Sequence, residues 1–385
     1  MSSTVQGCQV FPQNNIWNAP INGLPLLPSS AAMIAAMQAA TAGETFLRCD
    51  DTYTINIVPP GTPLVPVNFS GNTQSDPGLY AIPNNAIVES GSDAHCLCLD
   101  PVAGILYELF GTSGGPGAWV CGSAAKWDLA SNALRPDTWT SADAAGLPMT
   151  PGVLRYSDIL AGSVNHCLRF TCSPTFDSYQ WPARHYASHD QTATDPMMGQ
   201  RFRLNAGFDV SSFSPNMQIV LNGLKTYGCM VADNGMTWGM QHDQDPRWDP
   251  NDLVTLHNVL GSNMEAVDVS SLMVDPNSGA TTVVPNSVFM GDAIGRANAV
   301  PLGIYLEVQA GKLRGIYPIQ YVNQPCVMQA DNSWLYPQPG RNVQIWRGGA
   351  LQTPGKDYTL NQSARQIVPT TPWAATDAVL AAYLY

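Results

Sequence analysis

Side chains capable of chemistry are concentrated between residues 135 and 203. This stretch holds six of the chain's 13 arginines and three of its six histidines, and its six aspartates leave it neutral inside an acidic chain. The chain has only four lysines, so its positive charge is mostly guanidinium, which matches planar carboxylates. Two interpretations stay open: arginine–aspartate pairs that tie loops to strands, or a groove for an acidic glycan.

Arg184, His185 and Tyr186 are the candidate catalytic residues. A polysaccharide lyase uses these residue types, since arginine neutralises a uronate carboxylate while histidine or tyrosine removes and returns the proton. Neighbouring residues on a strand point to opposite faces, so His185 and Tyr186 can share a site only on a loop. The alternative interpretation is a structural trio.

Eight further residues are candidates for ligand binding, because guanidinium groups suit acidic ligands and exposed indoles stack on sugar rings. They are Arg135, Asp137, Trp139, Arg155, His166, Arg169, Trp181 and Asp233. Asp137, Trp139 and Asp143 are spaced so that they could form a sugar-facing rim on a loop.

Glycoside hydrolysis is a separate possibility with a geometric requirement. It needs two carboxyl groups about 5 Å or about 6.5–9.5 Å apart, depending on the mechanism. Glu108, Asp233 and Asp245 are available acids, but the sequence does not single out a pair.

No cofactor or metal is expected. The chain has no P-loop, no G-x-S-x-G elbow, no H-E-x-x-H and no nucleotide-binding glycine pattern. His185 and His189 have i, i+4 spacing, but the preceding Pro182 does not favour the helix that such a metal site needs. Residues 243–249 carry three acids without the residue order of a calcium loop, which favours a polar loop.

Composition argues against two classes of partner. The chain has 17 basic and 29 acidic residues, a net charge of −12 and a pI near 4.7, whereas nucleic-acid binding needs clustered Lys and Arg. No run approaches 18 consecutive apolar residues, so no membrane span is expected. We therefore expect neither nucleic acid nor membrane as a partner.

The N-terminus and the nine cysteines bear on where the protein works. The first residues have no basic or apolar signal region, so we expect a protein that acts where it is made or leaves the cell inside an assembled particle. The cysteines are either small buried hydrophobic residues or partly disulfide-bonded, for example Cys167 to Cys172. Cys96 and Cys98 should lie on one face of a strand.

The body, residues 1–274, reads as mainly β with a few helices, a β-sandwich or jelly-roll-like domain. Helical patterns cover residues 31–40, 216–227 and 250–260. The clearest strands are residues 53–58, 95–99, 105–110, 164–170, 200–204 and 229–232. Residues 100–104 form a hairpin turn, because proline fixes φ and glycine permits a positive φ.

Two further segments follow the body. Residues 275–309 are rich in Asn, Ser, Gly and Thr and read as a linker or hairpin region. Residues 310–385 carry a net charge of +3, against −15 for the first 309 residues, and read as a small β-sandwich domain. Its expected strands are residues 342–347, 357–360 and 378–385, and residues 348–355 form the turn after the first of them.

Residues 343–360 and the apolar-aromatic end at 381–385 resemble a β-module of bacteriophage tail and virion proteins. In that module a strand is followed by R-N-G, a glycine-bearing turn, D-Y-T and another strand. Here Arg347-Gly348-Gly349 departs from R-N-G by one residue, which a tight turn tolerates because Asn and Gly both accept a positive φ. The resemblance implies a virion protein.

The body is similar to a family of uncharacterised, mostly secreted bacterial proteins. The similarity rests on residues 131–148, which include Ser141-Ala-Asp-Ala-Ala-Gly-Leu-Pro148, and on Trp181-Pro-Ala-Arg-His185 and Val231-Ala-Asp-Asn-Gly235. The similarity covers most of residues 8–274, and it implies an extracellular location without indicating an activity.

Together these observations predict a bacteriophage structural protein of tail-fibre or tailspike type that recognises a host surface glycan. It would assemble into virions in the host cytoplasm, reach the exterior on release, contact other virion proteins and form a homo-oligomer, most simply a trimer. Two alternatives stay open. The body could be a depolymerase, a lyase or glycosidase that cuts the glycan, or the protein could be a capsid or tail decoration without a ligand.

Overall fold

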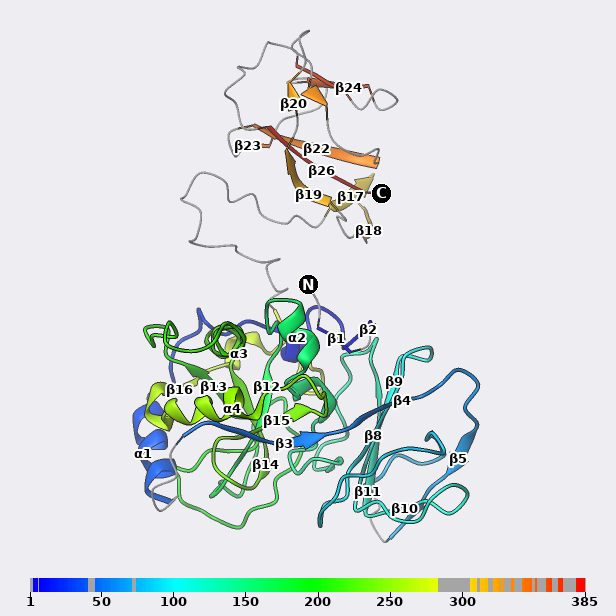
Figure 1. Ribbon diagram of the computed structural model, residues 1–385, viewed down its shortest axis with the longest axis vertical. Coiled ribbons are helices and arrows are strands. Elements are labelled where there is room, and N and C mark those ends of the chain that lie inside the picture. Colours follow the sequence, from blue (N-terminus) through cyan, green and yellow to red (C-terminus); the bar gives the residue numbers. More distant parts are fainter. Residues whose placement is uncertain are drawn as a thin grey trace. The chain divides into compact units, whose positions relative to one another are not determined.

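A computed structural model describes residues 3–5, 7–40, 46–70 and 74–282, together with the backbone of strands between Tyr305 and Leu384 (Figure 1). The chain divides into two compact units, Met1–Pro285 and Asn286–Tyr385. The fold is mainly β with a few helices and several sheets, as the sequence predicts. Within the described residues, no helix combines the length and apolar character that a membrane crossing requires.

A mixed six-stranded sheet forms the centre of the first unit. Its two middle strands, β14 and β12, run parallel, and β15 pairs antiparallel with β12. At the edges β3 runs parallel to β15, and β13 and β16 form an antiparallel pair. In spatial order the strands are β16 (Met264–Val267), β13 (Arg201–Leu204), β14 (Cys229–Asn234), β12 (Leu168–Cys172), β15 (Gly239–Asp243) and β3 (Arg48–Tyr53).

A four-stranded sheet lies beside it and is entered directly from β3, with Thr54 as the only connecting residue (Figure 1). Its spatial order is β11 (Ser123–Asp128), β9 (Ile105–Phe110), β8 (Cys96–Asp100) and β4 (Ile55–Ile57). The predicted turn joins β8 to β9: Gly104 has φ +67° and its N–H donates to the Asp100 carbonyl at 2.9 Å. This hairpin is confirmed.

Shorter pairs complete the strands of the first unit. They are β1 (Thr4–Val5) with β2 (Cys8–Gln9), β5 (Leu64–Pro66) with β7 (Leu79–Ala81), and β6 (Asn68–Phe69) with β10 (Val120–Cys121).

Four α-helices surround the six-stranded sheet, and two match the predicted ranges closely. They are α1 (Ser30–Ala40), α2 (Tyr156–Leu160), α3 (Pro215–Thr226) and α4 (Pro250–Leu253). The expected single helix over 250–260 is wrong: α4 ends at Leu253 and a 3₁₀ segment, Val254–Asn258, follows. The β-branched Val254 and Thr255 disfavour a longer α-helix, and the Thr255 hydroxyl donates to the Asp252 carbonyl at 2.6 Å. The other 3₁₀ segments are Ile16–Asn18, Thr150–Gly152, Gly261–Asn263 and Ser270–Leu272.

The two faces of the six-stranded sheet differ in chemistry. One face packs a buried aromatic cluster, in which Trp238 stacks on Phe170 with ring centroids 5.1 Å apart and meets Phe202 edge-on. On the other face the alternation of β12 places Arg169, which is buried and polar. The apolar face supplies the core, and the polar face carries the candidate site described below.

The eight described cysteines are free thiols, and seven of them are buried. Cys96 and Cys98 lie on one face as expected, with their sulfurs 3.7 Å apart. The alternative of a Cys167–Cys172 disulfide is wrong. Cys167 directly precedes the extended strand β12 and Cys172 is its last residue, so the two are five residues and roughly 16 Å apart, whereas a disulfide needs Cα atoms within about 7 Å. Cys326 lies outside the described residues.

The second unit is a set of strands. Those predicted at 342–347, 357–360 and 378–385 are confirmed as β22 (Arg341–Arg347), β24 (Tyr358–Asn361) and β26 (Val379–Leu384). The others are β17 (Tyr305–Gln309), β18 (Lys312–Tyr317), β19 (Tyr321–Pro325), β20 (Val327–Met328), β21 (Trp334–Leu335), β23 (Ala350–Leu351) and β25 (Gln366–Pro369).

The predicted linker over 275–309 is only partly described. Ser278 and Ala280 form β-bridges to Ala133 and Asn15, so the start of this segment belongs to the first unit, while Tyr305–Gln309 is strand β17. Residues 283–304 and most of the predicted turn at 348–355 lie outside the described residues.

Gly228, which follows α3, gives a test of the packing. It has φ +63°, and a Cβ there would lie 2.0 Å from the Phe202 carbonyl oxygen. Gly61 has a comparable φ of +81° with nothing within 4 Å. We expect Gly228→Ala to cost about 4 kcal/mol of unfolding free energy in urea denaturation, from strain plus overpacking, and Gly61→Ala only about 1 kcal/mol from strain. Equal losses would contradict this packing.

Candidate functional site

The candidate site is built around Arg169 on the polar face of the six-stranded sheet. Its guanidinium forms a bidentate ion pair with Asp143, with Nη2 2.6 Å from Oδ1 and Nε 3.2 Å from Oδ2. Nη1 also donates to the Gln241 side-chain oxygen and, at 3.3 Å, to the Tyr53 hydroxyl. Burial works against the charge of Arg169, but the neighbouring Asp143 carboxylate keeps the pKa of Arg169 above its ordinary value. One side chain thus joins β12, β15, β3 and the loop that carries Asp143.

A β-bulge brings Asp233 to this face. Phe170 pairs with Val231, but the next residue, Thr171, pairs with Asp233, so Ala232 is the extra residue. In regular pairing Asp233 would face the apolar side with Phe170; the bulge turns it to the side of Thr171 and Arg169. The carbonyl of the extra residue is satisfied by the Ala145 N–H at 2.9 Å, which holds the Asp143 loop against β14.

A side-chain hydrogen bond between Asp143 and Asp233 contributes to the pKa of both carboxyl groups. Burial and the negative charge of Asp143 raise the pKa of Asp233 to about 7, while Arg169 opposes the rise. Burial also raises the pKa of Asp143, against the pull of Arg169. Because Asp143 is fixed on the guanidinium, the proton of this hydrogen bond belongs on Asp233. Asp143 is 1% exposed, and Asp233 is the more exposed residue of the pair.

A third acid, Glu108 on β9, supports the site from the four-stranded sheet. It is fully buried and accepts from the backbone N–H groups of Met149 (2.9 Å) and Thr150 (2.7 Å) and from the Trp127 indole (3.0 Å). Burial raises its pKa. The segment that it holds ends at Gly152, where a Cβ would lie 2.6 Å from the Arg169 Cβ. Glu108 therefore fixes the backbone that packs on Arg169.

Three ring side chains lie near the end of β14 that carries Asp233. Tyr186 stacks between Tyr179 and His185, with centroid distances of 6.2 and 6.1 Å, and it is 38% exposed. The Ala144 carbonyl accepts from His185 Nδ1 at 2.8 Å, next to Asp143 in sequence. The Asn234 amide, next to Asp233, donates to the Ala187 carbonyl at 2.9 Å. We call Tyr179, His185 and Tyr186 the aromatic stack.

The three candidate catalytic residues do not share one environment. His185 and Tyr186 lie on a loop, which is the condition for sharing a site, and both belong to the aromatic stack. Arg184 is buried and occupied by protein groups: it donates at 2.9 Å to the Pro276 carbonyl and to the Asn277 side chain. It also lies 3.3 Å from Asp137, whose other contact is the Tyr179 hydroxyl at 2.9 Å.

Two other candidate ligand-binding residues form an internal cluster. Arg155 and His166 are both 1% exposed, and both contact Asp158, at 3.4 and 3.1 Å. Burial alone would raise the pKa of Asp158, but the charges of Arg155 and His166 lower it to about 2. Asp158 also accepts from the Arg155 backbone N–H at the start of α2, so this cluster holds α2 to His166, and no hydrogen bond is described between it and Asp143 or Asp233.

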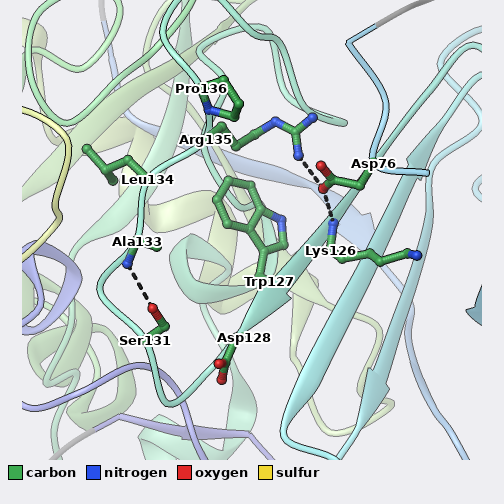
Figure 2. A pocket seen from close by; sticks show the side chains of 9 residues that line it. All are labelled: Asp76, Lys126, Trp127, Asp128, Ser131, Ala133, Leu134, Arg135 and Pro136. Atoms are coloured by element: carbon green, nitrogen blue, oxygen red, sulfur yellow. Dashed lines mark hydrogen bonds and ion pairs between the residues drawn. The ribbon is translucent and has the colours of Figure 1, made fainter. Parts of the chain in front are cut away.

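Arg135, Trp139 and Trp181 take structural positions, and of the three only Arg135 lines the pocket of about 200 Å³ beside Trp127. Figure 2 shows Trp127 at its centre, with Arg135 above it and bound to Asp76. The Arg135 guanidinium also lies over the rings of Trp127 and Trp139, at 5.7 and 5.5 Å. The Trp181 indole donates to the Ser278 carbonyl at 2.8 Å.

Of the two interpretations of the arginine-rich stretch, pairing with acids fits five of its six arginines. Arg135, Arg155, Arg169, Arg184 and Arg203 each contact an aspartate or glutamate, whereas Arg201 donates to the backbone carbonyls of Ile16 and Tyr227. From the predicted ligand-binding set the site uses Arg169 and Asp233, from the predicted catalytic set it uses His185 and Tyr186 in the aromatic stack, and Asp143 comes from the expected rim. No sequence signal links Asp143 to Asp233, because the bulge that brings them together has no signature of its own. Among the described residues no group of three or more His, Cys, Asp or Glu is placed to hold a metal ion.

Removal of Arg169 should be costly. Arg169→Gln leaves the buried Asp143 without its counter-charge, and we expect a loss of about 3–5 kcal/mol of unfolding free energy in urea denaturation. Arg247→Gln is the matched control, because Arg247 pairs with Asp245 at the surface and should change stability little. Similar small losses for both variants would show that the pair does not organise this region.

The raised pKa of Asp233 predicts a pH dependence of stability. Between about pH 4, the ordinary aspartate value, and about pH 7, the folded protein holds this proton and the unfolded chain does not. The free energy of unfolding contributed by Asp233 therefore declines as the pH rises through this window. We expect Asp233→Asn to remove that decline in denaturation curves measured from pH 4 to pH 8. A slope equal to that of the unmodified protein would contradict a raised pKa at this position.

Comparison with known proteins adds no relative: no family model, no curated protein and no solved structure matches the chain.

Proposed function

We propose that the first unit is a polysaccharide-cleaving domain in which Asp233 is the general acid and Asp143 the carboxylate that keeps it protonated. The observation that carries this proposal is the β-bulge that brings Asp233 to the buried Arg169–Asp143 pair, where burial and the charge of Asp143 raise the pKa of Asp233 to about 7. A general acid works best when its pKa lies near the working pH, because it is then both protonated and able to give up the proton. Structural carboxylates in ordinary ion pairs have pKa values well below this.

The carbohydrate class of the substrate is proposed from the aromatic stack. Tyr186 is exposed, and stacked rings beside an acid site suit the apolar face of a sugar. The stack is tied to both members of the acid pair, through Ala144 beside Asp143 and through Asn234 beside Asp233. A sugar ring on Tyr186 would therefore lie close to the proton on Asp233.

The geometry favours one acid–base unit over two carboxylates that flank a glycosidic bond. Hydrogen-bonded carboxylates are closer together than the roughly 5 Å of a retaining glycosidase. The exposed Asp51 is on the same face but three strands from Asp233, roughly 14 Å away, which exceeds the inverting separation. In a lyase, His185 or Tyr186 would take the proton from the carbon next to the uronate carboxyl while Asp233 gives its proton to the leaving oxygen. In a hydrolase, water would add to the sugar carbon as the bond to the leaving oxygen breaks, and the proton that the water loses would restore the one given up by Asp233. In both cases the negative charge of Asp143 would keep the pKa of Asp233 high before the step.

The biological setting is proposed from the resemblances. We place this domain in a bacteriophage virion protein of tail-fibre or tailspike type, with a sandwich or jelly-roll-like body, a small β-sandwich at the C-terminus and a homotrimeric state. Host surface polysaccharide and other virion proteins would be its partners. Recognition of the glycan without cleavage is the second candidate function, which the exposed Tyr186 favours. The remaining alternative is a capsid or tail decoration protein that binds no glycan.

The test uses surface polysaccharide purified from the bacterial host. We expect cleavage that falls as the pH rises through about 7, since Asp233 must be protonated. Asp233→Asn should lower the rate about 10²–10⁴-fold, while the exposed Asp209→Asn should leave it unchanged. Ultraviolet absorbance from unsaturated ends identifies a lyase, and new reducing ends alone identify a hydrolase.

Three outcomes would overturn the enzyme proposal. Binding without cleavage, lost in Tyr186→Ala and kept in Tyr186→Phe, would establish recognition instead. Cleavage that survives in Asp233→Asn would move the chemistry elsewhere. Neither binding nor cleavage would leave an architectural role.

A further inference from the structure

His95 lies beside the acid pair without belonging to it. It directly precedes β8 in the four-stranded sheet and is 4% exposed. Its ring packs between Tyr53 and Phe110, with centroids 5.5 and 5.6 Å away. Because Tyr53 accepts from Arg169, the ring is one side chain removed from the Asp143 ion pair.

Both ring nitrogens of His95 have fixed partners. Nε2 lies 3.1 Å from the Ala142 carbonyl oxygen, and Nδ1 contacts a carboxylate oxygen of Glu89. A carbonyl oxygen can only accept, so Nε2 must carry a proton. Glu89 is held in turn by the His95 backbone N–H at 3.2 Å, and its own N–H donates to the His95 carbonyl at 2.8 Å. The imidazole is thus oriented by an acid and aimed at one backbone carbonyl.

That carbonyl belongs to the residue before Asp143. The loop has other ties around this point: the Ser123 hydroxyl on β11 donates to the Ser141 carbonyl at 2.7 Å, the Asp143 N–H donates to the Ser141 hydroxyl at 2.9 Å, and the Ala145 N–H reaches β14. The Ser123 contact holds the residue two positions before Asp143, and the His95 contact holds the residue directly before it. Together they fix the loop on the side of the four-stranded sheet, while the bulge carbonyl fixes it on the side of β14.

We propose that His95 is a positioning residue for the acid pair: oriented by Glu89, it donates to the Ala142 carbonyl and holds Asp143 against Asp233. The proposal rests on the function proposed above, because a positioned pair has this purpose only if its proton is used. It predicts a property measurable without substrate. If the loop relaxes, Asp143 moves away from Asp233 and water enters, and both changes lower the pKa of Asp233.

Charges from every neighbouring element bear on this pKa. Asp233 faces Asp143 from the loop, Arg169 from β12 and the Tyr53 hydroxyl from β3. His95 faces Glu89, and Asp51 lies within electrostatic reach of Glu89 and Arg169. A variant that keeps a donor toward Ala142 without the imidazole ring separates the effect of the hydrogen bond from that of the ring.

The experiment compares His95→Gln with His95→Leu in the full chain. Glutamine can place an amide N–H near the position of Nε2, whereas leucine fills similar space with no donor. The readout is the ¹³C carboxyl shift of Asp233 during pH titration, assigned by its loss in Asp233→Asn. We expect the pKa to stay near 7 in the unmodified protein and in His95→Gln, and to fall by about one unit or more in His95→Leu.

The outcomes separate the two proposals. An ordinary Asp233 pKa in the unmodified protein would remove the basis of the proposed function. A pKa near 7 that is unchanged in His95→Leu, or lowered equally in both variants, would overturn the positioning role alone. If His95→Leu does not fold, the ¹⁵N ring signals of the unmodified protein decide: a His95 ring without a proton on Nε2 while Asp233 titrates would overturn it.

Discussion

The buried ion pair between Arg169 and Asp143 organises the polar half of the first unit. A guanidinium and a carboxylate removed from water are stable only when the pairing is bidentate and the remaining donors are satisfied. Asp143 supplies the first condition, and Gln241 and Tyr53 the second. The requirement fixes three strands and a loop to one side chain, and the charge of Asp143 together with burial raises the pKa of the neighbouring Asp233 to about 7.

The same charge arrangement explains why the site lies between a sheet and a loop. The apolar face of the six-stranded sheet is filled by Phe170, Phe202 and Trp238, so polar groups are confined to the opposite face. There the acids outnumber the cations, and each acid is accommodated differently. Asp143 has a guanidinium, Glu108 has backbone and indole N–H donors, Glu89 has His95, and Asp233 keeps its proton. The pKa of Asp233 is therefore raised because the strongest donors of the region serve the other acids.

The sequence predicts much of the local structure and little of the site. The hairpin at Asp100–Gly104 and strand β22 follow from turn residues and alternation, which are local signals. Arg169 and Asp233 could be predicted as candidates because they are charged residues next to strands and turns. Their arrangement in space could not be predicted, because it depends on the extra residue Ala232 and on a loop 90 positions earlier in the chain. Arg155 and His166 show the converse: suitable residue types that the fold uses to stabilise its interior.

The bulge in β14 has a consequence for how this region can change over generations. Side chains alternate along a strand, so Asp233 lies on the Arg169 face only because Ala232 takes no pairing partner on β12. Loss of the single codon for Ala232 would keep Asp233 opposite Thr171, but it would remove the carbonyl that accepts from the Ala145 N–H. Every acidic side chain of the site would still be encoded, yet the loop that carries Asp143 would lose this tie to β14. The site therefore depends on the length of this strand as well as on its side chains.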